Sequence, residues 1–179
     1  MQLLQQIING ITIGSFYALV ALGYTMVYGV LKLINFAHGD LFMWGAYLGL
    51  TGVSLLAGLA GAGQPWMAIP VVIGVLALIA FTGVLVERVA YRPLRAAGRL
   101  APIISALGVA FILESIARNV YGARWRTYPT GVAPAGGFVL AGSVRISTMQ
   151  IAVLVISFLL MAGLYLFVQR TRVGTAMRA

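Results

Sequence analysis

Long apolar stretches separated by short polar segments are the main pattern along this chain. None of the stretches alternates apolar and polar residues as a membrane barrel strand does. A helix of about 20 apolar residues crosses the hydrocarbon core of a bilayer and satisfies its own backbone hydrogen bonds there. The pattern therefore predicts an all-α fold, a polytopic transmembrane helix bundle of five spans. We place them at about 7–31, 41–60, 67–89, 103–121 and 149–169.

Composition supports a membrane protein and excludes several other classes. Of the 179 residues, 61% are hydrophobic and 8% charged, which is far from a soluble globular domain. The net charge is +9, and because the arginines flank apolar runs, we attribute it to membrane orientation rather than nucleic-acid binding. There is no cysteine, so disulfides and Cys-based metal sites are excluded, and we expect no metal. The N-terminal MQLLQQIING lacks the basic region of a cleaved signal and is read as part of a retained span.

Basic residues are divided unequally between the two sides of the predicted bundle. One side has Lys32, Arg88, Arg92, Arg95, Arg99, Arg170, Arg172 and Arg178, and the other has Arg118, Arg124, Arg126 and Arg145. The positive-inside rule places the N-terminus outside and the segments 32–40, 91–102 and 170–179 in the cytoplasm. The loop 122–148 is then external, and its FVLAGSVRIS stretch is expected to form a small hairpin or a half-inserted segment. Aromatic residues suit the two membrane interfaces: Trp66, Tyr121, Trp125 and Tyr128 outside, Tyr91 inside.

Small residues and tyrosines recur at helical spacing in the first two spans. Gly10, Gly14, Tyr17, Ala21, Tyr24 and Tyr28 fall on one face of the first span. The second span carries Gly45, Gly49 and Gly52. Glycines at this spacing favour close helix packing, and the tyrosine row fits either packing or a wet pathway.

An acid, Glu114, lies near the middle of the fourth span. Inserting this acid into a membrane costs about 3 kcal/mol, whereas nine large apolar residues of the span contribute about −4 to −5 kcal/mol. Insertion of the span is therefore marginal, and the carboxyl needs a partner. Arg118 follows one turn later on the same face, in the favourable order. Either a structural ion pair or a lumen-facing, protonatable role fits this position.

The segment INFAHGD, residues 34–40, lies between the first two predicted spans. It contains Asn35, Phe36, His38, Gly39 and Asp40, and His38 is the single histidine of the chain. Asp40 is expected to cap the following helix, and Gly39 to supply backbone freedom. Apolar residues in a polar link predict a packed inner break, because non-helical backbone at membrane depth lies within protein or lines water.

Two blocks of sequence resemble one transporter family. Residues 9–47, and ERVAYRPLR followed by LAPIISALGVAFIL at 87–95 and 100–113, are similar to the permease subunits of branched-chain amino-acid ABC importers, of the LivH type. The tail TRVGTAMRA, 171–179, resembles the start of the cytoplasmic coupling loop of that family. Family members continue well past residue 179, so 1–179 is expected to be the N-terminal part of a single permease domain. They also more often have Gln where this chain has Glu114.

The resemblance implies an importer subunit that moves branched-chain amino acids across the inner membrane by alternating access. It implies a second related permease, two cytoplasmic ATPases and an external solute-binding protein as partners, within membrane lipid. The sequence has no G-x-x-x-x-G-K-[ST] motif, so we expect no cofactor on this chain and ATP on partner subunits. We further expect Tyr17, Tyr24, Tyr28 and Glu114 near the substrate pathway, and Arg170, Arg172 and Arg178 on the approach to the ATPase.

The sequence bears on three other functions. A permease of the same family for urea or another small amide fits the same residues. A passive channel would show rings of like charge or a carbonyl filter, and neither is evident. An intramembrane hydrolase lacks a G-x-S-x-G or H-E-x-x-H motif and a close pair of acids, so no catalytic residue is expected.

Overall fold

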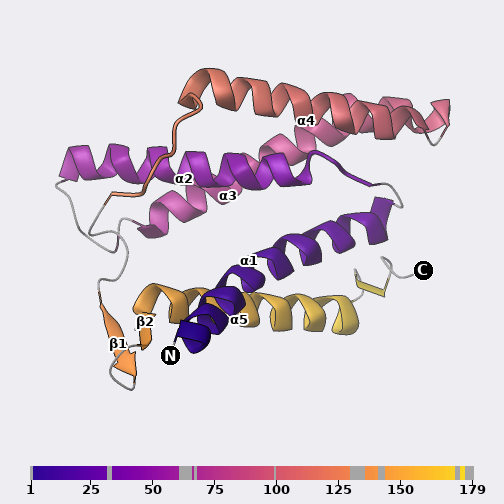
Figure 1. Cartoon of the computed structure of the whole chain (residues 1–179). Helices are drawn as coiled ribbons and strands as arrows, with labels where there is room; N and C mark the ends of the chain where they lie inside the picture. The colour runs from indigo at the N-terminus through magenta and orange to yellow at the C-terminus, as the bar shows by residue number, and fades with distance from the viewer. Residues whose placement is uncertain are drawn as a thin grey trace. The chain divides into compact units, whose positions relative to one another are not determined.

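Five long helices dominate the computed structural model of this chain (Figure 1). They are α1 (Gln2–Leu31), α2 (His38–Ala60), α3 (Ala68–Val86), α4 (Leu100–Tyr121) and α5 (Thr148–Arg170). The structure describes residues 2–31, 34–60, 66, 68–98, 100–129, 136–140, 144–171 and 174–175. All five helices are long and apolar enough to cross a membrane, which confirms the predicted helical bundle of a multi-pass membrane protein. The chain divides into two compact units, residues 1–32 with 133–179 and residues 33–132.

The first unit consists of α1, α5 and a β-hairpin. Strands β1 (Gly137–Leu140) and β2 (Val144–Ser147) pair antiparallel, with Gly137 opposite Ser147 and Leu140 opposite Val144. Of the two alternatives for FVLAGSVRIS, the hairpin is thus confirmed. Helix α5 begins with a capping box: the Ser147 hydroxyl accepts from the Met149 N–H, and the Gln150 side chain accepts from the Ser147 N–H.

Helix α1 begins at Gln2, five residues before the predicted start of the first span. The Gln5 side chain explains this extension, because its amide pairs with the backbone of β2. It donates to the Arg145 carbonyl at 2.9 Å and accepts from the Arg145 N–H at 2.8 Å. Asn9 accepts a further bond from Gln150 on α5. The polar first turns of α1 are therefore held by the hairpin and α5.

The second unit packs α2 against α3 and α4. Small side chains are buried at these contacts, and Ala106 and Ala117 of α4 are 2% and 3% exposed. The contact between α2 and α3 is tight at Gly52, where an added Cβ would lie 2.9 Å from Val71 Cγ1. Close approach of small residues is the usual way in which helices associate in membranes.

The link between α3 and α4, which follows the predicted end of the third span at 89, is mostly helical. Helix α3 continues into a π-helical turn, Glu87–Tyr91, and then a 3-10 helix, Arg92–Ala97. Pro93 lies at the beginning of the 3-10 helix, where its missing N–H costs little. Gly98, with φ of +94°, ends this helix, and α4 begins at Leu100.

Candidate functional site

The break between α1 and α2 is organised by Asn35. Its side-chain oxygen accepts from the Ala37 N–H at 3.1 Å and from the Tyr91 hydroxyl at 2.7 Å. Its carbonyl accepts from the His38 N–H at 3.1 Å, and Ala37 is fully buried. Tyr91 is 6% exposed and anchors the α1–α2 link to the π-helical turn, while its place at the inner membrane interface stays a prediction.

The predicted cap of α2 needs a correction. The helix begins at His38 rather than at 41, so His38, Gly39 and Asp40 form its first turn. Asp40 is therefore not the N-cap residue. A carboxylate in the first turn still stabilises the helix, because its negative charge interacts favourably with the positive end of the helix dipole. The Asn35 hydrogen bond to the Ala37 N–H precedes this turn.

A pocket of about 480 Å³ lies between α2, α4 and the segment 122–128. Its volume is within the range of small-molecule sites, about 300–1,000 Å³. Its charged lining comes from Glu114, Arg118, Arg124 and Arg126. Its apolar and aromatic lining includes Met43, Ala46, Tyr47, Leu50, Trp125 and Tyr128.

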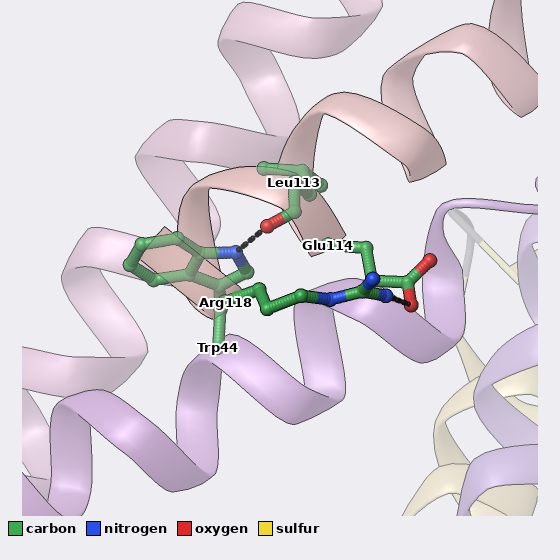
Figure 2. A network of polar contacts seen from close by, with 4 residues as sticks. All are labelled: Trp44, Leu113, Glu114 and Arg118. Atoms are coloured by element: carbon green, nitrogen blue, oxygen red, sulfur yellow. Dashed lines mark hydrogen bonds and ion pairs between the residues drawn. The ribbon is translucent and has the colours of Figure 1, made fainter. Parts of the chain in front are cut away.

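Aromatic side chains fix α2 and α4 beside this pocket. The Trp44 indole N–H donates to the Leu113 carbonyl of α4 at 3.0 Å (Figure 2). Tyr121, at the end of α4, stacks on Tyr47 with ring centroids 4.3 Å apart. Its hydroxyl lies 2.9 Å from the Thr51 hydroxyl. These contacts hold the two helices in register along one wall.

The end of α4 turns the chain back onto α2. Gly122, with φ of +75°, donates its N–H to the Arg118 carbonyl at 2.9 Å, a left-handed C-terminal cap that favours glycine. Arg126 donates to the Tyr121 carbonyl from Nε and Nη2, at 3.1 and 2.7 Å. A cation at this carbonyl also complements the negative end of the helix dipole.

Tyr128 closes the return segment onto α2. Its hydroxyl donates to the Ala46 carbonyl at 2.7 Å. A Cβ added at Gly49 would lie 2.8 Å from that hydroxyl, so any larger residue at position 49 would displace the Tyr128 side chain. Burial raises the pKa of the Tyr128 phenol above its ordinary value, because the charged phenolate is disfavoured away from water. Tyr128 therefore stays a hydrogen-bond donor at neutral pH.

Glu114 and Arg118 form the predicted ion pair, which joins Nη2 of the arginine to Oε1 of the glutamate (Figure 2). The Arg118 side chain is 65% exposed and that of Glu114 is 47% exposed. The structural pair is thus confirmed, and the pair also lines the pocket. Whether it contacts a solute stays a prediction.

The tyrosines predicted near the substrate pathway lie on α1, in the first unit. Tyr17 is 72% exposed and Tyr28 50% exposed, while Tyr24 is half-buried. Their role in a pathway stays a prediction. Arg170 is the last residue of α5, whereas Arg172 and Arg178 lie outside the described residues.

The predicted packing glycines fall into two groups. Gly49 and Gly52 leave no space for a Cβ beside Tyr128 and Val71. At Gly10, Gly14 and Gly45 an added Cβ meets no atom within 4 Å among the described residues, so their packing role stays a prediction. No group of three or more His, Cys, Asp or Glu side chains that could hold a metal occurs in the part of the chain that the structure describes.

Sequence reasoning missed most of the pocket. It singled out Glu114 but not Tyr47, Arg126 or Tyr128 as neighbours. A signal was present in YGARWRTY, residues 121–128, where aromatic and basic residues alternate directly after a helix. The return of this segment onto α2 depends on the Gly122 turn, which the spacing of apolar residues does not reveal.

Comparison with known proteins gives consistent matches. The family model described as branched-chain amino acid transport system, permease component, matches residues 6–179. The high-affinity branched-chain amino acid transport system permease protein BraD of Pseudomonas aeruginosa is 43% identical over 98% of this chain. The LivH permease proteins of Escherichia coli and Salmonella typhimurium, which carry the same description, are each 38% identical over 98% of this chain.

The chain spans 58% of the length of each of these relatives. No solved structure matches it significantly. The family model nevertheless covers almost every residue present, including the INFAHGD segment, α4 and its ion pair. This chain belongs to the family of branched-chain amino acid transport system permease components.

Proposed function

We propose that this chain is a permease subunit of an ATP-binding-cassette importer for branched-chain amino acids. The observation that carries the proposal is the family match over residues 6–179. The relatives named above are permease proteins of high-affinity branched-chain amino acid transport systems, and five membrane-crossing helices suit such a role. We assign transport by alternating access, in which the permease subunits rock about a central pathway.

The partners we propose are a second related permease, two cytoplasmic ATPases and an external solute-binding protein. The 179 residues contain no phosphate-binding G-x-x-x-x-G-K-[ST] motif, so we assign ATP to the ATPase subunits and no catalysis to this chain. The Tyr17, Tyr24 and Tyr28 row is assigned to the pathway, and the segment after Arg170 to the approach of an ATPase.

The orientation we propose has the N-terminus outside the inner membrane. It rests on eight basic residues on one side against four on the other. Single cysteines can test it, since Trp125 is fully exposed after α4 and Ala96 is exposed in the 3-10 helix. A membrane-impermeant thiol reagent added to intact cells should label Trp125→Cys and leave Ala96→Cys unlabelled. The reverse pattern would invert the topology.

The proposed transport function is tested by uptake into vesicles. The full-length protein is reconstituted with its neighbouring permease, its ATPases and leucine-loaded binding protein. We expect leucine uptake that requires ATP hydrolysis and stops when a non-hydrolysable nucleotide replaces ATP. Uptake that persists without hydrolysis indicates a passive channel. ATP-dependent uptake of urea in place of leucine assigns the other solute class.

A further inference from the structure

The α2–α4 pocket combines opposite charges with an apolar wall. Glu114 and Arg118 lie one turn apart on α4, and Met43, Ala46 and Leu50 of α2 line the same cavity. An α-amino acid carries an ammonium and a carboxylate on one carbon, so two opposite charges on neighbouring turns of a helix complement both. An aliphatic side chain suits the α2 wall, where burial of apolar surface is favourable.

The ion pair leaves hydrogen-bonding capacity for a ligand. One contact joins Arg118 Nη2 to Glu114 Oε1. The second carboxylate oxygen points away from the guanidinium, as Figure 2 shows. A guanidinium has five N–H donors, and a carboxylate accepts at both oxygens. Water screens a pair that is about half exposed, so opening it costs little.

The surroundings favour an anionic group. Arg124 and Arg126 also line the pocket, which gives its four charged side chains an excess of positive charge. Arg126 is occupied at the Tyr121 carbonyl, through both Nε and Nη2. The carboxylate of a ligand is therefore attracted to the arginine side, and its ammonium has Glu114 as a counter-charge.

The third wall of the pocket is the non-helical segment that follows α4, residues 122–128. Tyr128 holds the segment 122–129 against Ala46, in the first half of α2. Ala46 belongs to a helix that is long and apolar enough to cross a membrane. Irregular backbone that packs on such a helix is covered by protein or lines a water-filled cavity, and transporters place solute sites beside it. The segment thus fits a wet site better than a lipid-facing surface.

We propose that this pocket is a station of the transport path that binds the zwitterionic head of an aliphatic α-amino acid. The Glu114 carboxylate accepts from the ammonium, the Arg118 guanidinium donates to the carboxylate, and the side chain lies against Met43, Ala46 and Leu50. This assignment rests on the proposed import function, and it names the residues that recognise the solute after the binding protein has released it.

Protection of single cysteines tests occupancy of the pocket directly. The 179 residues contain no cysteine, so Ala46→Cys or Leu50→Cys places one thiol on the α2 wall. Any cysteine elsewhere in the full-length protein is replaced first. Asn119→Cys is the matched control, because Asn119 is exposed on α4 but does not line the pocket. The complex with its partners is placed in vesicles and treated with a small thiol reagent.

We expect L-leucine to slow modification of the pocket thiols at least threefold and to leave Asn119→Cys unchanged. At the same concentration, 4-methylpentanoate, which lacks the ammonium, and 3-methylbutylamine, which lacks the carboxylate, should protect less than half as well. The double variant Glu114→Gln with Arg118→Gln keeps a neutral contact between the two side chains. It should assemble normally and lose the protection by leucine.

Uptake by the unmodified complex separates this site from the proposed function. Leucine uptake without protection of either thiol overturns the site, as does full protection in the neutral double variant. Protection of the pocket thiols without any leucine uptake keeps the site and overturns the import function. Equal protection by all three compounds overturns recognition of the zwitterion, because it shows a site that responds to the aliphatic chain alone.

Discussion

The contact between α2 and α3 at Gly52 allows a quantitative prediction. A Cβ at this position would lie 2.9 Å from Val71 Cγ1 and 3.3 Å from Cγ2. Carbon atoms in contact prefer about 3.5–4.0 Å, so Gly52→Ala requires a displacement of about 0.6 Å. Val71 is 9% exposed and β-branched, which leaves it little rotamer freedom to move aside. The two helices must therefore separate.

The size of the effect follows from two opposing contributions. Overpacking of a buried contact costs about 1–3 kcal/mol, and replacing a mid-helix glycine by alanine gains about 1 kcal/mol. Gly74→Ala on α3 is the matched control, because an added Cβ there meets no atom of the described residues within 4 Å. It has the helical gain without the clash. We therefore expect Gly52→Ala to be less stable than Gly74→Ala by about 1–3 kcal/mol.

Titration of the purified full-length protein with a denaturing detergent, followed by circular dichroism, measures this difference. Val71→Ala removes both clashing methyl groups, so Gly52→Ala should cost less in that background than in the native one. If Gly52→Ala and Gly74→Ala unfold at the same detergent fraction, the α2–α3 contact described above is not the one that the protein adopts.

Three further predictions concern the inner break and the pocket. Tyr91→Phe removes the hydroxyl donor to Asn35 and should cost about 0.5–1.5 kcal/mol, seen as faster amide exchange at residues 35–38; unchanged exchange would contradict the anchoring role. Gly49→Ala should displace Tyr128 from the Ala46 carbonyl, so it should add little to the loss caused by Tyr128→Phe in a detergent titration; full additivity would refute a shared contact. Asp40→Ala should lower the yield of assembled complex more than the affinity for leucine, because its carboxylate stabilises the first turn of α2; normal yield with weakened affinity would reverse that assignment.

The sequence predicted the helices well because each span must satisfy its backbone within lipid. Five spanning helices were expected and five occur among the described residues, and the Glu114–Arg118 pair follows directly from helical spacing. The ends of the helices were predicted less accurately, because contacts of polar side chains determine where a helix begins. Gln5 extends α1 through contacts with a strand 140 residues away, and hydropathy carries no information about such a contact.

The pocket was harder to predict because its walls come from distant segments. Gly, Pro and aromatic side chains determine two of the turns in this unit. One gives the 3-10 helix at Arg92–Ala97, and the other returns the segment 122–128 onto α2. Tyr91 and Tyr128 were assigned to membrane interfaces from their amphipathic character. In the structure each uses its hydroxyl for a specific hydrogen bond within the second unit, to Asn35 and Ala46 respectively.

The charges of Glu114 and Arg118 are not explained by the stability of α4. Glu114 costs about 3 kcal/mol near the centre of a membrane helix, whereas an exposed ion pair contributes about 0–1 kcal/mol. Both side chains are about half exposed and face the pocket, so neither is shielded by packing. A neutral Gln–Gln pair removes the insertion cost and keeps the contact along the helix. The double variant should therefore accumulate at least as well as the native protein, and a lower yield of folded protein would show that the ion pair is required for folding.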